Sequence, residues 1–127
     1  MDATSFDKIV EQRIEKTRAL LLKKRAEYAA GGRDRLHNFN RAAEMLRTTR
    51  EKALVGMWAK HVVSILDIVD DFPKVVPSIE MIDEKLGDLI NYSILLEANL
   101  KEDIARINSE KKILTMSANL AKNIKKN

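Results

Sequence analysis

The chain has 127 residues, 45% of them hydrophobic and 33% charged, a composition that predicts one folded domain rather than a disordered chain. It contains no cysteine, which excludes disulfides and cysteine-based zinc sites. The net charge is +4, but the first 100 residues hold 16 basic and 16 acidic side chains, so the excess lies in the tail and we do not expect nucleic acid as a partner.

Two helices are expected in the first third of the chain. Thr4 or Ser5 is the predicted N-cap of the first helix. Gly31-Gly32 is its predicted end, because glycine tolerates the left-handed conformation that follows many helix C-termini. After a loop over residues 33–38, apolar side chains at helical spacing predict a short second helix over residues 39–46.

The next two predicted helices are separated by both prolines of the chain. Thr48, followed three residues later by Glu51, forms a capping-box pattern that opens a long helix. Residues 72–78 contain the two prolines and form a connection, because proline disrupts helix interiors. Ser78 is the predicted cap of the fourth helix.

The C-terminal segment is expected to be helical as well. Apolar side chains recur at helical spacing from Ile104 to Ile124, which suits packing on the chain's own body or on a second copy. We therefore predict an all-α fold, a helical bundle of four to five helices with a long C-terminal helix. Residues 1–100 would form the helical core with a ligand groove, and residues 101–127 a basic helical extension. The apolar positions after Leu100 have no obvious partner in so short a chain, so a homo-oligomer is expected.

The start of the chain and its hydropathy predict its location. The first seven residues are acidic and polar, unlike the basic and then apolar pattern of a signal peptide. No apolar run approaches the roughly 20 residues that a membrane helix needs. We expect a cytoplasmic protein with no membrane partner.

Two rows of polar side chains follow the third and fourth predicted helices, at about 100° per residue. The first row consists of Lys60, Ser64, Asp67 and Asp71, with His61 beside it. The second row consists of Glu84, Asp88 and Asn91, with Tyr92 on its flank. A short connection makes the two helices antiparallel, so we expect the rows to face each other across a groove.

The chemistry of this predicted groove suits a phosphorylated ligand. Asp67, Glu84 and Asp88 are the candidate ligands for Mg²⁺, the one cofactor expected here, because Mg²⁺ takes one or two carboxylates together with substrate phosphates. Lys60 would bind a phosphate, and Asn91 a base edge or a sugar hydroxyl. The alternative is a solvated face with ion pairs between neighbouring turns, and the spacing alone leaves both interpretations open.

Four segments, in order along the chain, carry a family resemblance. They are Lys24-Arg-Ala-Glu-Tyr28, Asp34-Arg-Leu-His-Asn-Phe39, Lys60-His-Val-Val-Ser-Ile-Leu-Asp67 and Glu84-Lys-Leu-Gly-Asp-Leu-Ile-Asn-Tyr92. Together they resemble a family of small phage and prophage proteins described as nucleotide-modification-associated. The resemblance covers about residues 6–100 and leaves the basic tail outside. It implies a phage origin and a link to nucleotides, and its segments contribute these candidate ligand-binding residues: Lys24, Arg35, His37, Asn38, Lys60, His61, Ser64, Asn91 and Tyr92.

A more distant likeness concerns residues 83–88, Asp-Glu-Lys-Leu-Gly-Asp. This run is similar to the second metal motif of the all-α nucleoside triphosphate pyrophosphohydrolases, the MazG and dimeric dUTPase group. That group needs a carboxylate three residues before Asp88, where this chain has Lys85. The departure implies weaker Mg²⁺ binding and favours holding a phosphate without cleaving it.

Three functions are compatible with these patterns. The first is a phage-type protein that captures a phosphorylated nucleotide, or a nucleotide immune signal, in an inter-helix pocket and withholds it from the host. The second is a Mg²⁺-dependent nucleotide pyrophosphohydrolase, in which Glu27 or His61 would be the catalytic base. The third is a helical inhibitor that docks on a host protein. The departure at Lys85 favours the first, a binding protein rather than an enzyme.

Overall fold

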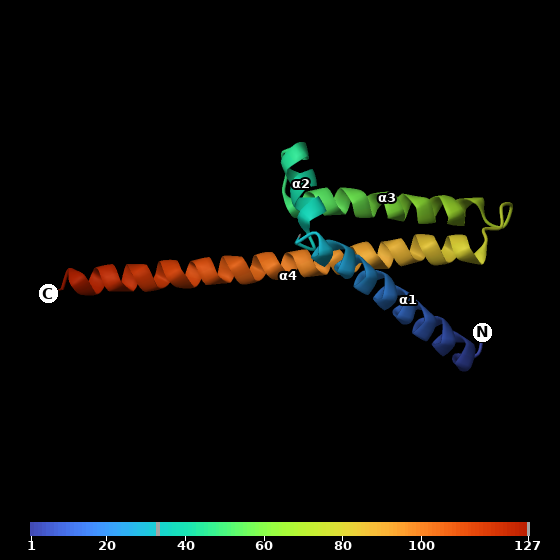
Figure 1. Cartoon of the computed structure of the whole chain (residues 1–127), viewed down its shortest axis with the longest axis horizontal. Helices are drawn as coiled ribbons and strands as arrows, with labels where there is room; N and C mark the ends of the chain where they lie inside the picture. Colours follow the sequence, from blue (N-terminus) through green and yellow to red (C-terminus); the bar gives the residue numbers. More distant parts are fainter. Residues whose placement is uncertain (33, 127) are drawn as a thin grey trace.

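Four α-helices make up the described part of the chain, which contains no strand. The computed structural model describes residues 1–32 and 34–126, with the side chains of residues 28–30 set aside. Arg33 of the predicted loop and Asn127 lie outside the described residues. The helices are α1 (Ala3–Ala30), α2 (His37–Leu46), α3 (Arg50–Asp71) and α4 (Ile79–Ile124) (Figure 1). The all-α prediction is confirmed, and the predicted fourth and C-terminal helices form one helix of 46 residues.

The two ends of α1 show how local residues set its limits. The Asp2 carboxylate accepts hydrogen bonds from the backbone N–H of Ser5 at 2.8 Å and from Ser5 Oγ at 2.9 Å. The prediction that Thr4 or Ser5 caps this helix is wrong, because Asp2 precedes them and caps equally well. The predicted end is confirmed, since α1 stops at Ala30 and Gly32 has a φ of 61°, in the left-handed region.

The junction between α2 and α3 corrects the second predicted cap. The backbone N–H of Thr48 donates to the carbonyl of Ala43 at 3.0 Å, so Thr48 closes the end of α2. The following residue, Thr49, caps α3 instead, and its Oγ1 accepts from the backbone N–H of Lys52 at 3.3 Å. The predicted cap was one residue too early, because two threonines are adjacent: Thr48 belongs to the end of α2, and Thr49 caps α3.

The helices form an open, elongated arrangement (Figure 1). α3 and the first half of α4 lie antiparallel, joined by residues 72–78, and Ser78 Oγ caps α4 as predicted by accepting from the N–H of Met81 at 3.1 Å. α2 packs on α3, and α1 crosses α4. The second half of α4 extends well past the other three helices. None of the described helices is both long and apolar enough to cross a membrane.

The hydrophobic core is small and lies where α2, α3 and α4 meet. Leu36, Phe39 and Leu54 are buried at its centre, and Leu54 has no exposed surface at all. Four partly buried residues of α3 and α4 pack against them: Met57, Tyr92, Leu95 and Leu96. This core holds α2 and α3 against the same stretch of α4 that carries the predicted second polar row.

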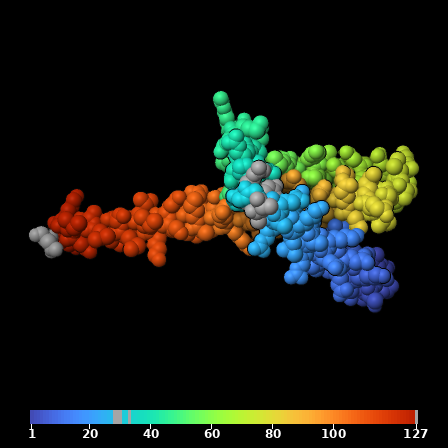
Figure 2. Space-filling view, viewed as in Figure 1, coloured from blue at the N-terminus to red at the C-terminus, as the bar shows by residue number. Residues whose placement is uncertain are grey.

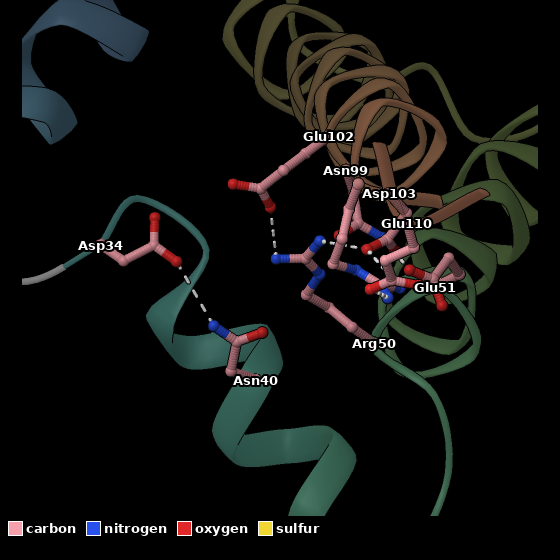
Figure 3. Close-up of polar contacts among 9 residues, drawn as sticks. Asp34, Asn40, Arg50, Glu51, Asn99, Glu102, Asp103 and Glu110 are labelled. Carbon is pink, nitrogen blue, oxygen red and sulfur yellow. Dashed lines mark hydrogen bonds and ion pairs between the residues drawn. The ribbon is translucent and has the colours of Figure 1, made fainter. Parts of the chain in front are cut away.

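A polar cluster ties the start of α3 to the middle of α4 (Figure 3). Asn99 is completely buried, and its Nδ2 donates to Oε1 of Glu51 at 2.9 Å. The Arg50 guanidinium pairs with Glu102 at 2.8 Å and with Asp103 at 3.3 Å. From Ile104 to Lys126 every residue is exposed, so the cluster marks the point at which α4 leaves the body (Figure 1).

Candidate functional site

An open pocket of about 420 Å³ lies among α1, the start of α2, α3 and α4. Seven of the residues singled out from the sequence line it: Lys24, Arg35, Asn38, His61, Asp88, Asn91 and Tyr92. Leu20, Leu21, Phe39, Met57 and Leu95 form its apolar lining. Residues far apart in the sequence therefore meet here, because α1 crosses α4 beside the core that holds α2 and α3.

Aromatic rings form one wall of the pocket. The Tyr92 ring packs edge-on against the buried Phe39 ring, with centroids 6.1 Å apart and an interplanar angle of 78°. On its other side it lies against the His61 imidazole, at a centroid distance of 4.6 Å and an angle of 36°. His61 Nδ1 is 3.6 Å from Oδ2 of Asp88, which makes an ion pair when the imidazole is protonated. The core thus holds Tyr92, and Tyr92 and Asp88 together position His61.

Asn91 is the buried polar group of the site. Its side chain is only 6% exposed, and Oδ1 has no hydrogen-bond donor among the described residues. A buried polar atom left in this way costs about 1–3 kcal/mol. Such a group needs an explanation, which an ordered water, an ion or a ligand can supply. Asn91 lines the pocket, so a ligand donor placed there would satisfy it.

Two cationic side chains reach the same pocket. Lys24 comes from α1, and Arg35 precedes α2. Lys24 Nζ pairs with Oε2 of Glu27 at 2.9 Å, and this hydrogen bond lowers the pKa of the Glu27 carboxyl. Glu27 is exposed and does not line the pocket, and its lowered pKa makes it a weaker base, so the structure gives no support to Glu27 as a catalytic base.

A second hollow, of about 360 Å³, borders the first through Leu20, Asp88 and Asn91. Here α1 is held on α4 by ion pairs, since both Arg13, at 2.6 Å, and Lys16 pair with the Asp83 carboxylate. The hydrogen bond from Lys16, together with the nearby charges, lowers the pKa of Asp83.

Gly87 leaves room beside α4 for the guanidinium of Arg13. A Cβ atom at Gly87 would lie 2.8 Å from Nη1 of Arg13, closer than real Cβ contacts. Arg13 was not singled out from the sequence, because nothing in its local pattern indicates a partner 70 residues away.

The first predicted polar row does not face the second. Lys60 and Asp67 are exposed and line neither hollow, and Ser64 Oγ donates to the carbonyl of Lys60 at 3.1 Å. The buried face of α3 is centred on Leu54, and His61, seven residues on, shares it. Lys60 and Asp67 precede His61 and Ile68 by one residue each and so lie about 100° around the helix. The prediction that the two rows face each other across a groove is therefore wrong for the α3 row.

Two other candidates, His37 and Glu84, lie outside the pocket. His37 is half-buried at the start of α2 and does not line the pocket. Glu84 lines the second hollow and pairs with Lys85 at 3.0 Å. In residues 1–32 and 34–126, the structure shows no group of three or more histidine or acidic side chains that could hold a metal ion. Asp67 lies apart on α3, whereas Glu84 and Asp88 both line the second hollow, so the three predicted Mg²⁺ ligands are not brought together.

Comparison with known proteins found no match: no family model, no curated protein and no solved structure matches the chain. The resemblance to the phage and prophage family stays an expectation. The site must therefore be interpreted from its own chemistry.

Proposed function

We propose that the pocket among the four helices binds a small phosphorylated, nucleotide-like molecule. The observation that carries this proposal is the meeting, in one pocket, of two cations, an aromatic wall and a buried amide. Lys24 and Arg35 supply the cations, Tyr92 with His61 the wall, and Asn91 the amide.

Each of these groups matches one part of a nucleotide. Lysine binds a phosphate as a point charge, and the guanidinium of Arg35 can bind two of its oxygens at once. An aromatic face stacks on a nucleobase, and such stacking contributes about 1–3 kcal/mol per base. The Asn91 carboxamide both donates and accepts, as a base edge or a sugar hydroxyl requires.

The size and lining of the pocket agree with such a ligand. Its volume of about 420 Å³ lies inside the range of about 300–1,000 Å³ that is usual for small-molecule sites. Five aliphatic and aromatic residues line it beside the polar ones, as expected for a site that excludes water from a base.

The placement of the acidic residues supports a protein that binds its ligand without cleaving it. Glu27 is paired with Lys24 outside the pocket, and Asp67 is exposed on another face of α3. Among the described residues that line the pocket, Asp88 alone carries a carboxylate, and it lies beside His61. The protein would thus act by capturing its ligand. With the phage-type resemblance, the expected role is withholding a nucleotide signal from a host cell.

Calorimetry with the intact chain tests the proposal. The probes are the common nucleoside mono-, di- and triphosphates and a set of cyclic mono- and dinucleotides, with chromatography of each mixture afterwards. We expect at least one to bind and to be recovered unchanged. Lys24→Ala and Arg35→Ala should weaken that binding by about tenfold or more, whereas Lys60→Ala, a lysine outside the pocket, should not. Flat titrations with every probe, on a protein that circular dichroism shows to be folded, would rule the proposal out.

A further inference from the structure

The second half of α4 is a helical arm that packs on no other helix in the described part of the chain. Every residue from 104 to 126 is exposed, and Figure 2 shows the arm leaving the body as a single thin rod. Most helical stability in proteins comes from packing of an apolar face rather than from the helix itself. The arm therefore needs a surface to pack against.

The total exposed surface area also indicates that part of the chain packs against a partner. The chain exposes 10174 Å², about half as much again as a compact monomer of its mass of 14.5 kDa would expose. A typical stable interface takes about 800 Å² from each partner, and obligate dimers take more. The excess area exceeds what one stable interface removes.

One face of the arm carries a continuous heptad pattern. Its residues alternate four and three apart, and we call them the heptad stripe: Leu100, Ile104, Ile107, Lys111, Leu114, Ala118 and Ala121. Six of the seven are apolar. The larger ones are well exposed, at 56% for Ile104 and 70% for Leu114. Apolar residues at this spacing are what two helices need to form a coiled coil.

We propose that the heptad stripe packs against the heptad stripe of a second copy of this chain, which makes the protein a dimer joined by a two-stranded coiled coil. The occupant is a second copy because the stripe is self-complementary in pattern and the excess surface is large enough to supply the area that a stable dimer buries. The two alanines let the helices approach closely near the C-terminus.

Lys111 selects two strands over three or four. In the heptad it occupies the a position, with Leu100, Ile107 and Leu114 at d. In a two-stranded coil the long lysine stem lies along the apolar seam while its ammonium reaches water. In larger bundles the same side chain would lie in a closed core and lose that access.

A second apolar row on the arm provides a matched control. Ile113, Met116, Leu120 and Ile124 lie on the opposite side of the helix and are as exposed as the stripe, with Leu120 at 61%. A helix that merely aggregates would use both rows. A coiled coil through the stripe uses one.

Sedimentation of the intact chain at micromolar concentration tests the proposal. We expect a dimer that Ile104→Glu/Leu114→Glu converts to a monomer and that Ile113→Glu/Leu120→Glu leaves intact. A monomeric native protein would overturn it, as would a dimer that Ile104→Glu/Leu114→Glu leaves intact or that Ile113→Glu/Leu120→Glu dissociates.

Substitutions at the adjacent residues Lys111 and Lys112 provide a second test of the interface. Lys111→Ile removes the one charge from the stripe and should tighten self-association by about tenfold or more. Lys112→Ile adds the same side chain one residue further on, outside the stripe, and should leave the association unchanged. Equal effects of the two substitutions would contradict the stripe as the interface.

Discussion

The Tyr92 ring contacts the imidazole of His61, with centroids 4.6 Å apart, and also packs edge-on against the buried ring of Phe39. This contact joins the hydrophobic core to the candidate binding pocket. A side chain that serves both is expected to affect ligand binding more than its modest burial would suggest.

The first prediction concerns this ring. Tyr92→Leu keeps an apolar side chain of useful volume but removes the aromatic face. We expect nucleotide affinity to fall by about 1–3 kcal/mol, which is about one to two powers of ten in Kd. Calorimetry measures the loss, and circular dichroism checks that the variant is folded. An affinity equal to that of the native protein would mean that no base stacks on Tyr92.

The second prediction separates binding from stability at Asn91. Asn91→Leu replaces a buried oxygen that has no donor among the described residues by an apolar group. Removing such an oxygen should leave the free energy of unfolding unchanged or raise it by up to about 1 kcal/mol, while ligand binding is lost. Urea unfolding and calorimetry on the same preparation give both values. A marked loss of stability would show that Asn91 serves the fold rather than a ligand.

A third prediction concerns the buried amide between α3 and α4. Asn99→Ala removes the hydrogen bond to Glu51 and opens a small cavity, so we expect a loss of about 1–3 kcal/mol in the free energy of unfolding. Asn108→Ala, on the exposed arm of the same helix, is the matched control and should change it little. Equal effects in the two variants would contradict the role of the polar cluster shown in Figure 3.

A fourth prediction concerns the stability of the fold at acid pH. Lys16 and Arg13 lower the pKa of the Asp83 carboxyl in the folded chain. The stability that these ion pairs contribute is therefore present above the carboxyl's unfolded pKa of about 4. It is lost as the pH falls through the lower pKa of the folded state. Stability should therefore fall between neutral pH and pH of about 3, and fall less in Asp83→Asn. Asp67→Asn, an exposed carboxylate, is the control and should retain the full pH dependence. Identical pH dependence in all three proteins would contradict the role of the Asp83 pairs.

The sequence predicted the fold class and half of the site for clear physical reasons. Glycines, prolines and Ser78 delimit the helices through local backbone chemistry, which requires no knowledge of the rest of the chain. Asp88 and Asn91 share a face of α4, and that face packs toward α3 and α1. Their placement follows from helical periodicity alone.

The sequence misplaced the α3 row because the hydrophobic pattern of that helix does not define its rotation. Val63 and Val69 are apolar, yet they are 54% and 63% exposed, so apolar side chains occur on more than one face. A shift of one residue moves the predicted face by about 100°. Lys60 and Asp67 therefore lie on an exposed face of α3, whereas His61 lies on the face that packs toward the core.

The contribution of α1 depends on packing between distant parts of the chain. Arg13 and Lys16 meet Asp83 across 70 and 67 residues, and these ion pairs bring α1 and Lys24 to the pocket. No local spacing carries that information. Lys24 and Arg35 were singled out through the family resemblance, and the structure places both at the pocket.

The amide spectrum of isotopically labelled protein, recorded with and without each nucleotide of the panel, tests the central claim most directly. We predict that at least one nucleotide shifts the signals of Lys24, Asn38, His61, Asn91 and Tyr92 together and leaves those of Lys60 and Asp67 in place. Spectra that stay unchanged with every nucleotide, or shifts that gather on the exposed row of α3 or on the C-terminal arm, would contradict the pocket.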